Sequence, residues 1–199
     1  YKVVATWAAT DNLPQLTAED TFTINKRTLK IYSEKTEAYT GTSIVYNIEQ
    51  RLAENTTLAD GDQIAALSAS ITGTEVNTYD VLDAIAETDN KNFTITIKKG
   101  EEDVTANYDV TVAGKLTITK ADVASYNATV SLDDWTYGEN AKEENPSVAG
   151  PGSNAYAEPT YTYYAEGSET ALQAKPTNAG KYKVVATWAA TDNLPQLTA

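Results

Sequence analysis

Short runs in which apolar and polar residues alternate recur along the whole chain. Alternation with a period of two directs successive side chains to opposite faces of a β-strand, and the runs are rich in Val, Ile, Thr and Tyr, which suit a pleated surface. We favour a strand over one or two helical turns at residues 79–87, because β-branched residues precede them. The pattern predicts strands at residues 2–6, 21–25, 28–33, 43–48, 67–72, 78–85, 92–98, 108–112, 115–120, 128–132, 160–164 and 181–187.

Turn-forming residues separate these runs at short intervals. Gly, Pro, Asn and Asp mark turns because they adopt or preset the backbone angles that turns need. Short strands joined by such turns are typical of a β-sandwich, so the sequence predicts an all-β fold. The turn signals lie at Gly41, residues 59–62, Gly73, residues 99–101, Gly114, Pro146, residues 150–152 and residues 176–180.

The chain contains an identical repeat. Residues 1–18 and residues 182–199 both read YKVVATWAATDNLPQLTA, so that Tyr182 corresponds to Tyr1 and Ala199 to Ala18. Identity at every position predicts a tandem array of nearly identical copies, of which this chain spans one period, residues 1–181, and the start of the next. An engineered duplication or a permuted chain is the alternative.

The strand pattern divides this period into two modules. Residues 26–120 form one predicted sandwich of a common size, and residues 121–199 form a second immunoglobulin-like module that lacks its last strand. Residues 1–25 are then the C-terminal strands of the preceding module. Short linkers at 25–27 and 121–123 predict tandem immunoglobulin-like β-sandwich modules in an extended, semi-rigid array. We expect Ala199 to lie beside Glu19 of a neighbouring copy, through strand addition or chain continuity.

Composition removes several classes of function. The chain has no Cys and no His, and its net charge is −13. These features argue against a disulfide framework, a histidine-based active site, and charge-driven binding of nucleic acid or an anionic membrane. No uncharged run approaches the length that spans a membrane. Paired carboxylates such as Glu143 and Glu144 lie in charged, turn-like sequence, and we expect no enzymatic activity.

Two sets of motifs carry a family resemblance. Residues 58–64 (LADGDQI), 103–108 (DVTANY) and 114–120 (GKLTITK) resemble MBG-type repeats. Residues 135–139 (WTYGE), 161–164 (YTYY) and 175–182 (KPTNAGKY) resemble the module that accompanies them. The resemblance implies immunoglobulin-like tandem repeats of large bacterial cell-surface proteins, either adhesins or stalks.

One of these motifs also has a physical interpretation. In residues 178–182 a tight turn enters a strand, and Tyr182 is placed to bond back to the turn, as in a tyrosine corner. Gly180 would supply an unusual backbone angle there. Trp135 is expected to pack in the core or over the end of the second module.

Two acidic residues are candidate metal ligands. Asp60 and Asp62 lie in a Gly-containing turn, and calcium prefers several oxygen ligands. The span lacks the acidic spacing of an EF-hand loop, and solvated turn residues are the alternative. We expect no other cofactor.

Tyrosines in the second module are candidate ligand-binding residues. Tyr156, Tyr161, Tyr163 and Tyr164 would offer an aromatic surface to mucin or another glycan. Alternation along the strand places Tyr161 and Tyr163 on one face and Tyr164 on the other, so at least one of them is expected in the core.

The sequence therefore predicts a structural unit of an extracellular fibre or stalk on a bacterial surface. Its expected partners are neighbouring copies of the same repeat, joined head to tail, and its acidic charge keeps such a surface soluble. The alternative is an adhesin module that binds mucin, another glycan or a host protein.

Overall fold

The computed structural model describes residues 1–81 and 93–199, and in this part of the chain the fold is all-β, as predicted. Three short 3-10 turns, η1 (Thr105–Asn107), η2 (Val123–Ser125) and η3 (Ser153–Ala155), complete the structure. The strands are β1 (Lys2–Trp7), β2 (Leu16–Thr21), β3 (Arg27–Ala38), β4 (Ile44–Asn47), β5 (Asp62–Gly73), β6 (Asn77–Val81), β7 (Phe93–Lys99), β8 (Glu102–Asp103), β9 (Tyr108–Thr119), β10 (Asn127–Ser131), β11 (Asn145–Ala149), β12 (Thr160–Ala165), β13 (Tyr182–Trp188) and β14 (Leu197–Thr198).

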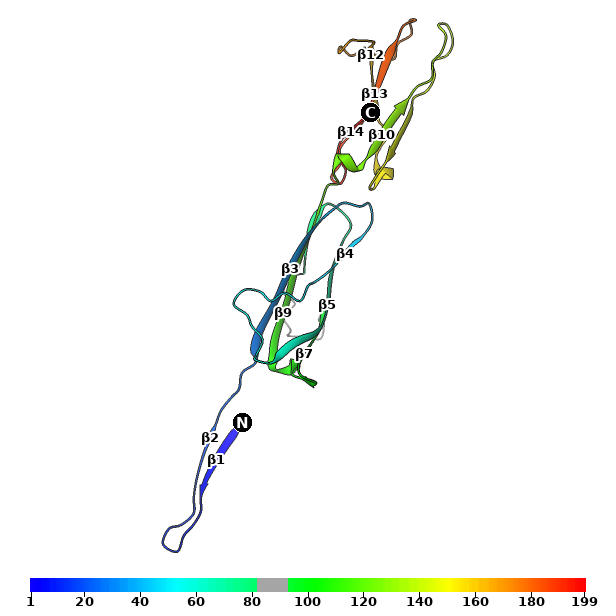
Figure 1. The fold of residues 1–199 in the computed structure, drawn as a ribbon. Helices are drawn as coiled ribbons and strands as arrows, with labels where there is room; N and C mark the ends of the chain where they lie inside the picture. Colours follow the sequence, from blue (N-terminus) through cyan, green and yellow to red (C-terminus); the bar gives the residue numbers. More distant parts are fainter. Residues whose placement is uncertain (82–92) are drawn as a thin grey trace. The chain divides into compact units, whose positions relative to one another are not determined.

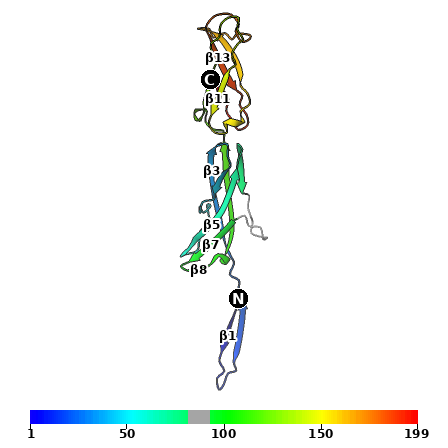
Figure 2. The same cartoon turned by 90° about the vertical axis from the view of Figure 1, so that its right-hand side faces the viewer.

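These strands form several small sheets (Figure 1). β1 pairs with β2, and β10 pairs with β11. The larger sheets have the orders β12-β13-β14, β3-β9-β6 and β4-β5-β7-β8. β5, β7 and β8 are neighbours in the last of these sheets (Figure 2). β6 is the start of the strand predicted at 78–85, and the rest of that strand lies outside the described residues.

The chain divides into two compact units. One contains residues 1–32, 49–68 and the described part of 83–112, and the other contains 33–48, the described part of 69–82, and 113–199. Each unit has its own buried residues. Leu29, Ile31 and Ile97 are fully buried in the first, and Leu116, Ile118 and Ala186 are fully buried in the second.

The alternation predicted from the sequence is present in the long strands. Along β9 every second residue is buried, from Tyr108 to Ile118, and the residues between them are partly or fully exposed. β3 shows the same pattern at Leu29, Ile31 and Ser33. The buried Ser33 is bonded, because the Tyr46 hydroxyl donates to Ser33 Oγ at 2.6 Å. Period-two patterning therefore decides which face of each strand enters the core.

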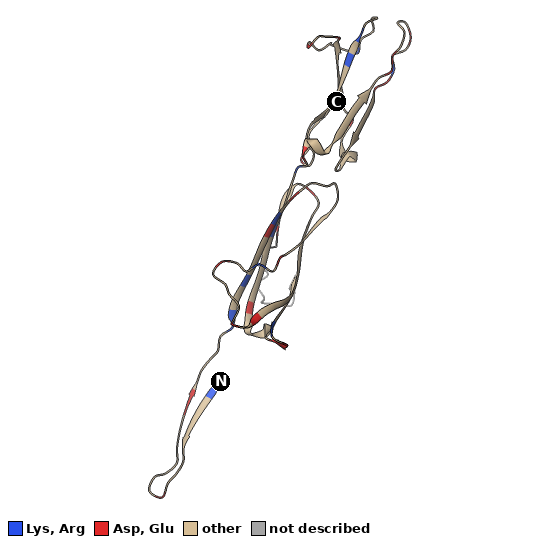
Figure 3. Cartoon of the chain, viewed as in Figure 1, with Lys and Arg blue, Asp and Glu red and all other residues tan. Residues whose placement is uncertain are grey.

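Charged residues are distributed over strands and loops of the described chain (Figure 3). Two of the ion pairs, Lys2–Glu19 and Lys35–Glu37, have side chains that are 40% or more exposed, and such pairs contribute little to stability. No helical segment among the described residues has the length and apolar character that crossing a membrane requires.

Candidate functional site

The duplicated segment forms the same hairpin at both ends of the chain. In the first copy Thr6 pairs with Thr17 and Trp7 with Leu16. In the second copy the corresponding residues pair in the same register, Thr187 with Thr198 and Trp188 with Leu197. The connecting turns also agree, because Thr10 N–H donates to Leu13 O at 2.9 Å and Thr191 N–H donates to Leu194 O at 3.0 Å. The duplicated sequence thus specifies one local structure in two settings.

The two hairpins differ in what covers their apolar face. Trp7 is 56% exposed, whereas the identical Trp188 is 4% exposed. Leu16 is 60% exposed, and its counterpart Leu197 is 3% exposed. Every residue of 1–28 is exposed. The N-terminal hairpin, β1–β2, therefore presents to solvent an apolar face that its copy buries.

Residues 121–181 cover the C-terminal copy. Ala186, Trp188 and Leu197 form a buried cluster, and partly buried residues of the preceding strands and turns pack against it. These residues are Tyr126, Ala128, Val130, Val148, Tyr156 and Tyr161. β12 also pairs with β13 over its whole length, from Thr160 opposite Thr187 to Ala165 opposite Tyr182. Residues 121–181 thus provide a surface that buries the apolar face of one copy of the duplicated hairpin.

One tyrosine fastens the turn of the C-terminal hairpin. The Tyr156 hydroxyl donates to Pro195 O at 2.7 Å, and its ring meets Tyr126 edge to face with the ring centroids 6.0 Å apart. Burial raises the pKa of Tyr156 to about 12, with a smaller contribution from Tyr126. Tyr156 therefore holds the duplicated segment in place through its hydroxyl.

The C-terminal hairpin has a shorter second strand than the N-terminal one. β2 continues to Thr21, so that Lys2, Val3 and Val4 pair with Thr21, Asp20 and Glu19. In the described C-terminal copy, pairing with β14 covers Thr187 and Trp188, and Ala186 and Ala199 exchange two backbone hydrogen bonds of 3.0 Å. Among the described residues, the next part of β13, Lys183–Val185, pairs with β12 alone. In the N-terminal copy the corresponding residues, Lys2–Val4, pair with Glu19–Thr21.

Tyr163 belongs to a buried polar network. It is buried, and its hydroxyl donates to Glu144 Oε1. Lys175 Nζ lies 2.8 Å from the same oxygen and 5.9 Å from the centre of the Trp135 ring. Burial raises the pKa of Tyr163, and the bond to Glu144 raises it further. Burial alone would raise the pKa of Glu144, but hydrogen bonds from Lys175 and Tyr163 outweigh it and the pKa is lowered.

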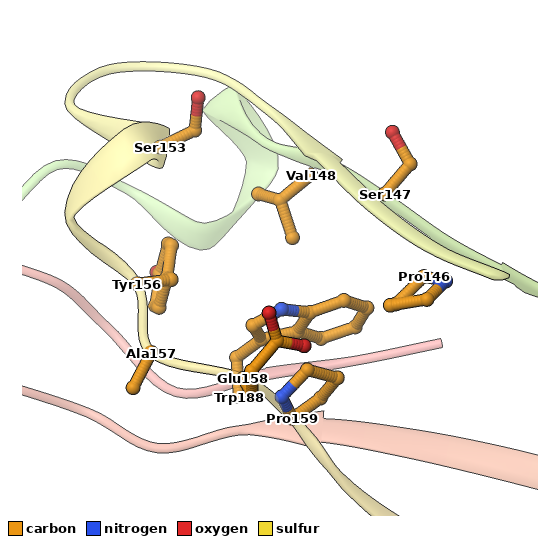
Figure 4. A pocket seen from close by; sticks show the side chains of 9 residues that line it. All are labelled: Pro146, Ser147, Val148, Ser153, Tyr156, Ala157, Glu158, Pro159 and Trp188. Carbon is orange, nitrogen blue, oxygen red and sulfur yellow. The ribbon is translucent and has the colours of Figure 1, made fainter. Parts of the chain in front are cut away.

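The other candidate tyrosines are partly buried. Tyr161 packs against the cluster around Trp188, and Lys183 Nζ lies 4.9 Å from the centre of the Tyr164 ring. A small pocket lies beside this cluster, and Tyr156, Glu158, Pro159 and Trp188 are among the residues that line it (Figure 4). Tyr156, Tyr161 and Tyr163 thus take part in the packing of residues 121–199, and a glycan site on them remains a prediction.

The candidate calcium turn is held by a tyrosine. Asp60 and Asp62 flank Gly61, whose φ of +80° is in the left-handed region that favours glycine. The Tyr108 hydroxyl donates to Asp62 Oδ2 at 2.6 Å and accepts from Ala59 N–H at 2.8 Å. Among the described residues there is no group of three or more acidic, His or Cys side chains that would hold a metal ion.

We expect calcium and EDTA to leave the melting temperature of the chain unchanged. The hydroxyl of Tyr108 already bonds Asp62, so calcium binding would need to break a formed hydrogen bond. Thermal unfolding with calcium and with EDTA measures this, because a ligand that binds the folded state raises its stability. A rise with calcium that Asp62→Asn abolishes would establish the site.

The sequence assigned residues 1–25 to a preceding module, but it did not name the apolar face of β1–β2 as a candidate site. The signal for it was present, because identity between 1–18 and 182–199 implies that both copies carry the same buried residues. Alternation alone gives no reason to expect one copy exposed and the other buried.

Comparisons of the chain with protein-family models, with curated proteins and with solved structures found no match. The residues and their geometry are therefore the basis of the functional argument.

Proposed function

We propose that the chain is a structural repeat of an extracellular bacterial surface fibre or stalk, in which residues 1–181 are one period and Tyr182 begins the next. In this proposal residues 26–120 and 121–199 are immunoglobulin-like sandwiches in tandem. Residues 1–25 complete a module whose first part belongs to the preceding copy along the same polypeptide.

The single observation that carries the proposal is the pair of identical hairpins. The C-terminal hairpin is seated on residues 121–181, and the N-terminal hairpin has the same register and an uncovered apolar face. Large exposed apolar surfaces on a folded chain mark interaction sites. A repeat that begins inside one module and ends inside the next copy of it accounts for both hairpins.

Charge and packing support the same proposal. A net charge of −13 in about one period makes neighbouring fibres repel each other. The hydroxyls of Tyr156 and Tyr163 bond within residues 121–199, to Pro195 O and to Glu144. This use of the tyrosines favours the structural role over the adhesin alternative, in which the same side chains would contact a glycan.

The proposal is tested with chains of two and three periods, in which residues 19–199 follow Ala199 once or twice. Short linkers and strands of ordinary rise predict that each added period lengthens the particle by about 60–80 Å. Small-angle X-ray scattering measures the maximum dimension. A dimension that grows only as that of a compact globule would contradict the fibre proposal.

A further inference from the structure

We propose that hairpin β1–β2 of one chain binds residues 121–181 of a second copy, where it takes the place of that copy's β13–β14. The partner is thus a second copy of this chain, and the event is an exchange of strands between separate molecules. The inference rests on the proposed function in one respect, that residues 1–25 and 182–199 are the same element of successive repeats.

The identity of the two segments determines the occupant. The residues that face the cluster in the C-terminal copy, Ala186, Trp188 and Leu197, correspond to Ala5, Trp7 and Leu16. Any surface that buries one set is complementary to the other. Such a surface exists in every copy of the chain, on residues 121–181.

The register of the exchanged complex follows from the correspondence of Tyr1 with Tyr182. β12 pairs with β13 from Thr160 opposite Thr187 to Ala165 opposite Tyr182. In the exchanged complex Thr6 of the donor chain lies opposite Thr160, and Tyr1 of the donor lies opposite Ala165.

The pairing within the donor hairpin, β1–β2, extends beyond the duplicated segment. Its second strand continues past Ala18 to Thr21, and Phe22 and Tyr1 exchange two further backbone hydrogen bonds of 3.0 and 2.9 Å. Phe22 stacks on Tyr1 with the ring centroids 5.5 Å apart, and Ile24 follows two residues later, beyond the end of β2. Phe22 and Ile24 are 50% and 71% exposed in the free hairpin. Burial of either side chain against the acceptor would add to the stability of the exchanged state.

The acceptor chain's own hairpin, β13–β14, competes with the donor hairpin and is favoured because it is covalently linked to residues 121–181. A short tether gives it an effective concentration on the order of millimolar, so exchange rises with the concentration of chains. Each chain carries one donor hairpin and one acceptor surface, so the contact is heterologous and joins chains head to tail into rings or open filaments.

Cysteine pairing tests the register directly, since the chain contains no Cys. Full-length Tyr1→Cys and Ala165→Cys chains are mixed at high concentration in a thiol redox buffer. Glu166 N–H donates to Lys181 O at 2.9 Å, so the next pair, Ala165–Tyr182, is of the closely spaced, non-hydrogen-bonded kind. That spacing is compatible with a disulfide. We expect disulfide-linked heterodimers, detected by intact mass under non-reducing conditions.

The control mixture moves the donor cysteine by one position along the chain. Lys2→Cys mixed with Ala165→Cys places the donor thiol on the opposite face of the strand. We expect cross-linking of the in-register pair to be at least about tenfold faster than that of this control, because a one-residue shift reverses side-chain direction. Equal rates, or no cross-link in either mixture, would overturn the inference.

A disulfide within one chain provides the second readout. The double variant Ala165→Cys/Tyr182→Cys forms a disulfide within the chain that ties β13 to β12, which prevents its displacement. We expect light scattering to show concentration-dependent assembly of the reduced variant and none of the oxidised variant. Assembly that persists in the oxidised variant would show that the exposed hairpins associate in another way, and would refute strand exchange.

This outcome is separable from the fibre proposal. Separate chains that fail to exchange, together with two-period chains that lengthen as expected, would remove the inference and leave the proposed function intact.

Discussion

Trp188→Ala is expected to destabilise the unit that contains residues 121–199 by about 3–5 kcal/mol, the usual cost of deleting a fully packed aromatic side chain. The identical change at Trp7 is expected to alter stability by no more than about 0.5 kcal/mol, because an exposed side chain has little packing to lose. The exposures of 4% and 56% are the basis of this contrast. The two variants share sequence neighbours, so local propensity cancels between them.

Urea unfolding followed by circular dichroism measures both changes. The chain contains more than one unit, so the transitions are fitted separately rather than as a single two-state process. Leu197→Ala and Leu16→Ala form a second matched pair with the same expected contrast. Equal destabilisation by Trp7→Ala and Trp188→Ala would mean that both hairpins are packed.

Lys175→Met is expected to lower the free energy of unfolding of the unit that contains residues 121–199 by about 2–3 kcal/mol, because it leaves the Glu144 carboxylate without its cation. The Glu144 side chain is 9% exposed and that of Lys175 is 25% exposed. Lys181→Met is the control, since Lys181 is 81% exposed and lies 3.8 Å from Glu166. A surface pair of that kind contributes about 0–1 kcal/mol.

The same network predicts a dependence on pH. Burial would raise the pKa of Glu144, but the hydrogen bonds from Lys175 and Tyr163 outweigh it and lower the folded-state pKa from its ordinary value of 4.5. A lowered carboxyl pKa gives stability that is present above the unfolded-state value and is lost as the pH falls through the folded-state value. The difference in stability between the unsubstituted chain and Lys175→Met is therefore expected to shrink below about pH 4.5. A difference that is constant with pH would exclude Glu144 as the group responsible.

The alternation of side chains predicted the fold class and most strands. It was wrong for the strand predicted at 21–25, because β2 is Leu16–Thr21 and the chain leaves the strand after Thr21. The strand predicted at 28–33 lies within β3, and both β3 and β9 bury every second residue over much of their length. The strands predicted at 108–112 and 115–120 are one strand, β9, so the turn predicted at Gly114 is wrong: Gly114 is buried inside β9 and pairs with Val81. Alternation carries this information because the core covers one face of each strand. The predicted bond from Tyr182 to its turn is confirmed, since its hydroxyl donates to Asn178 O at 3.0 Å.

Other expectations were wrong for local reasons. Pro146 was interpreted as a turn, but it lies inside β11 and pairs with Val130. β11 is an edge strand of a two-stranded sheet. Proline is tolerated in edge strands because the side that faces solvent has no neighbouring strand to accept a backbone hydrogen bond. Gly180 was expected to adopt an unusual backbone angle, but its φ is not in the left-handed region. Space favours glycine there, because a Cβ would lie 3.0 Å from the Tyr182 hydroxyl.

The candidate site was only partly predictable. Identity of the two segments is visible in the sequence, but burial of one and exposure of the other depends on which chain segments lie beside them. The pairing of Glu144 with Lys175 joins residues from separate stretches of the chain, on either side of β11 and β12. The charge pattern alone predicted that Glu144 is solvated. Its partner Lys175 is distant in the sequence, and only the fold brings the two residues together.

The central claim is that the two hairpins are one element of successive repeats. Extending the chain beyond Ala199 tests this claim most directly. Residues 19–25 (EDTFTIN) are appended after Ala199, and the control exchanges Thr21 with Phe22 and Thr23 with Ile24 in the appended copy, which moves both apolar side chains to the other face. Urea unfolding measures the stability of the unit that contains residues 121–199. Pairing of the extension with Lys183–Val185 predicts a gain of about 2 kcal/mol over the control, from burial of its Phe and Ile. Equal stability of the extended and control chains would contradict the account.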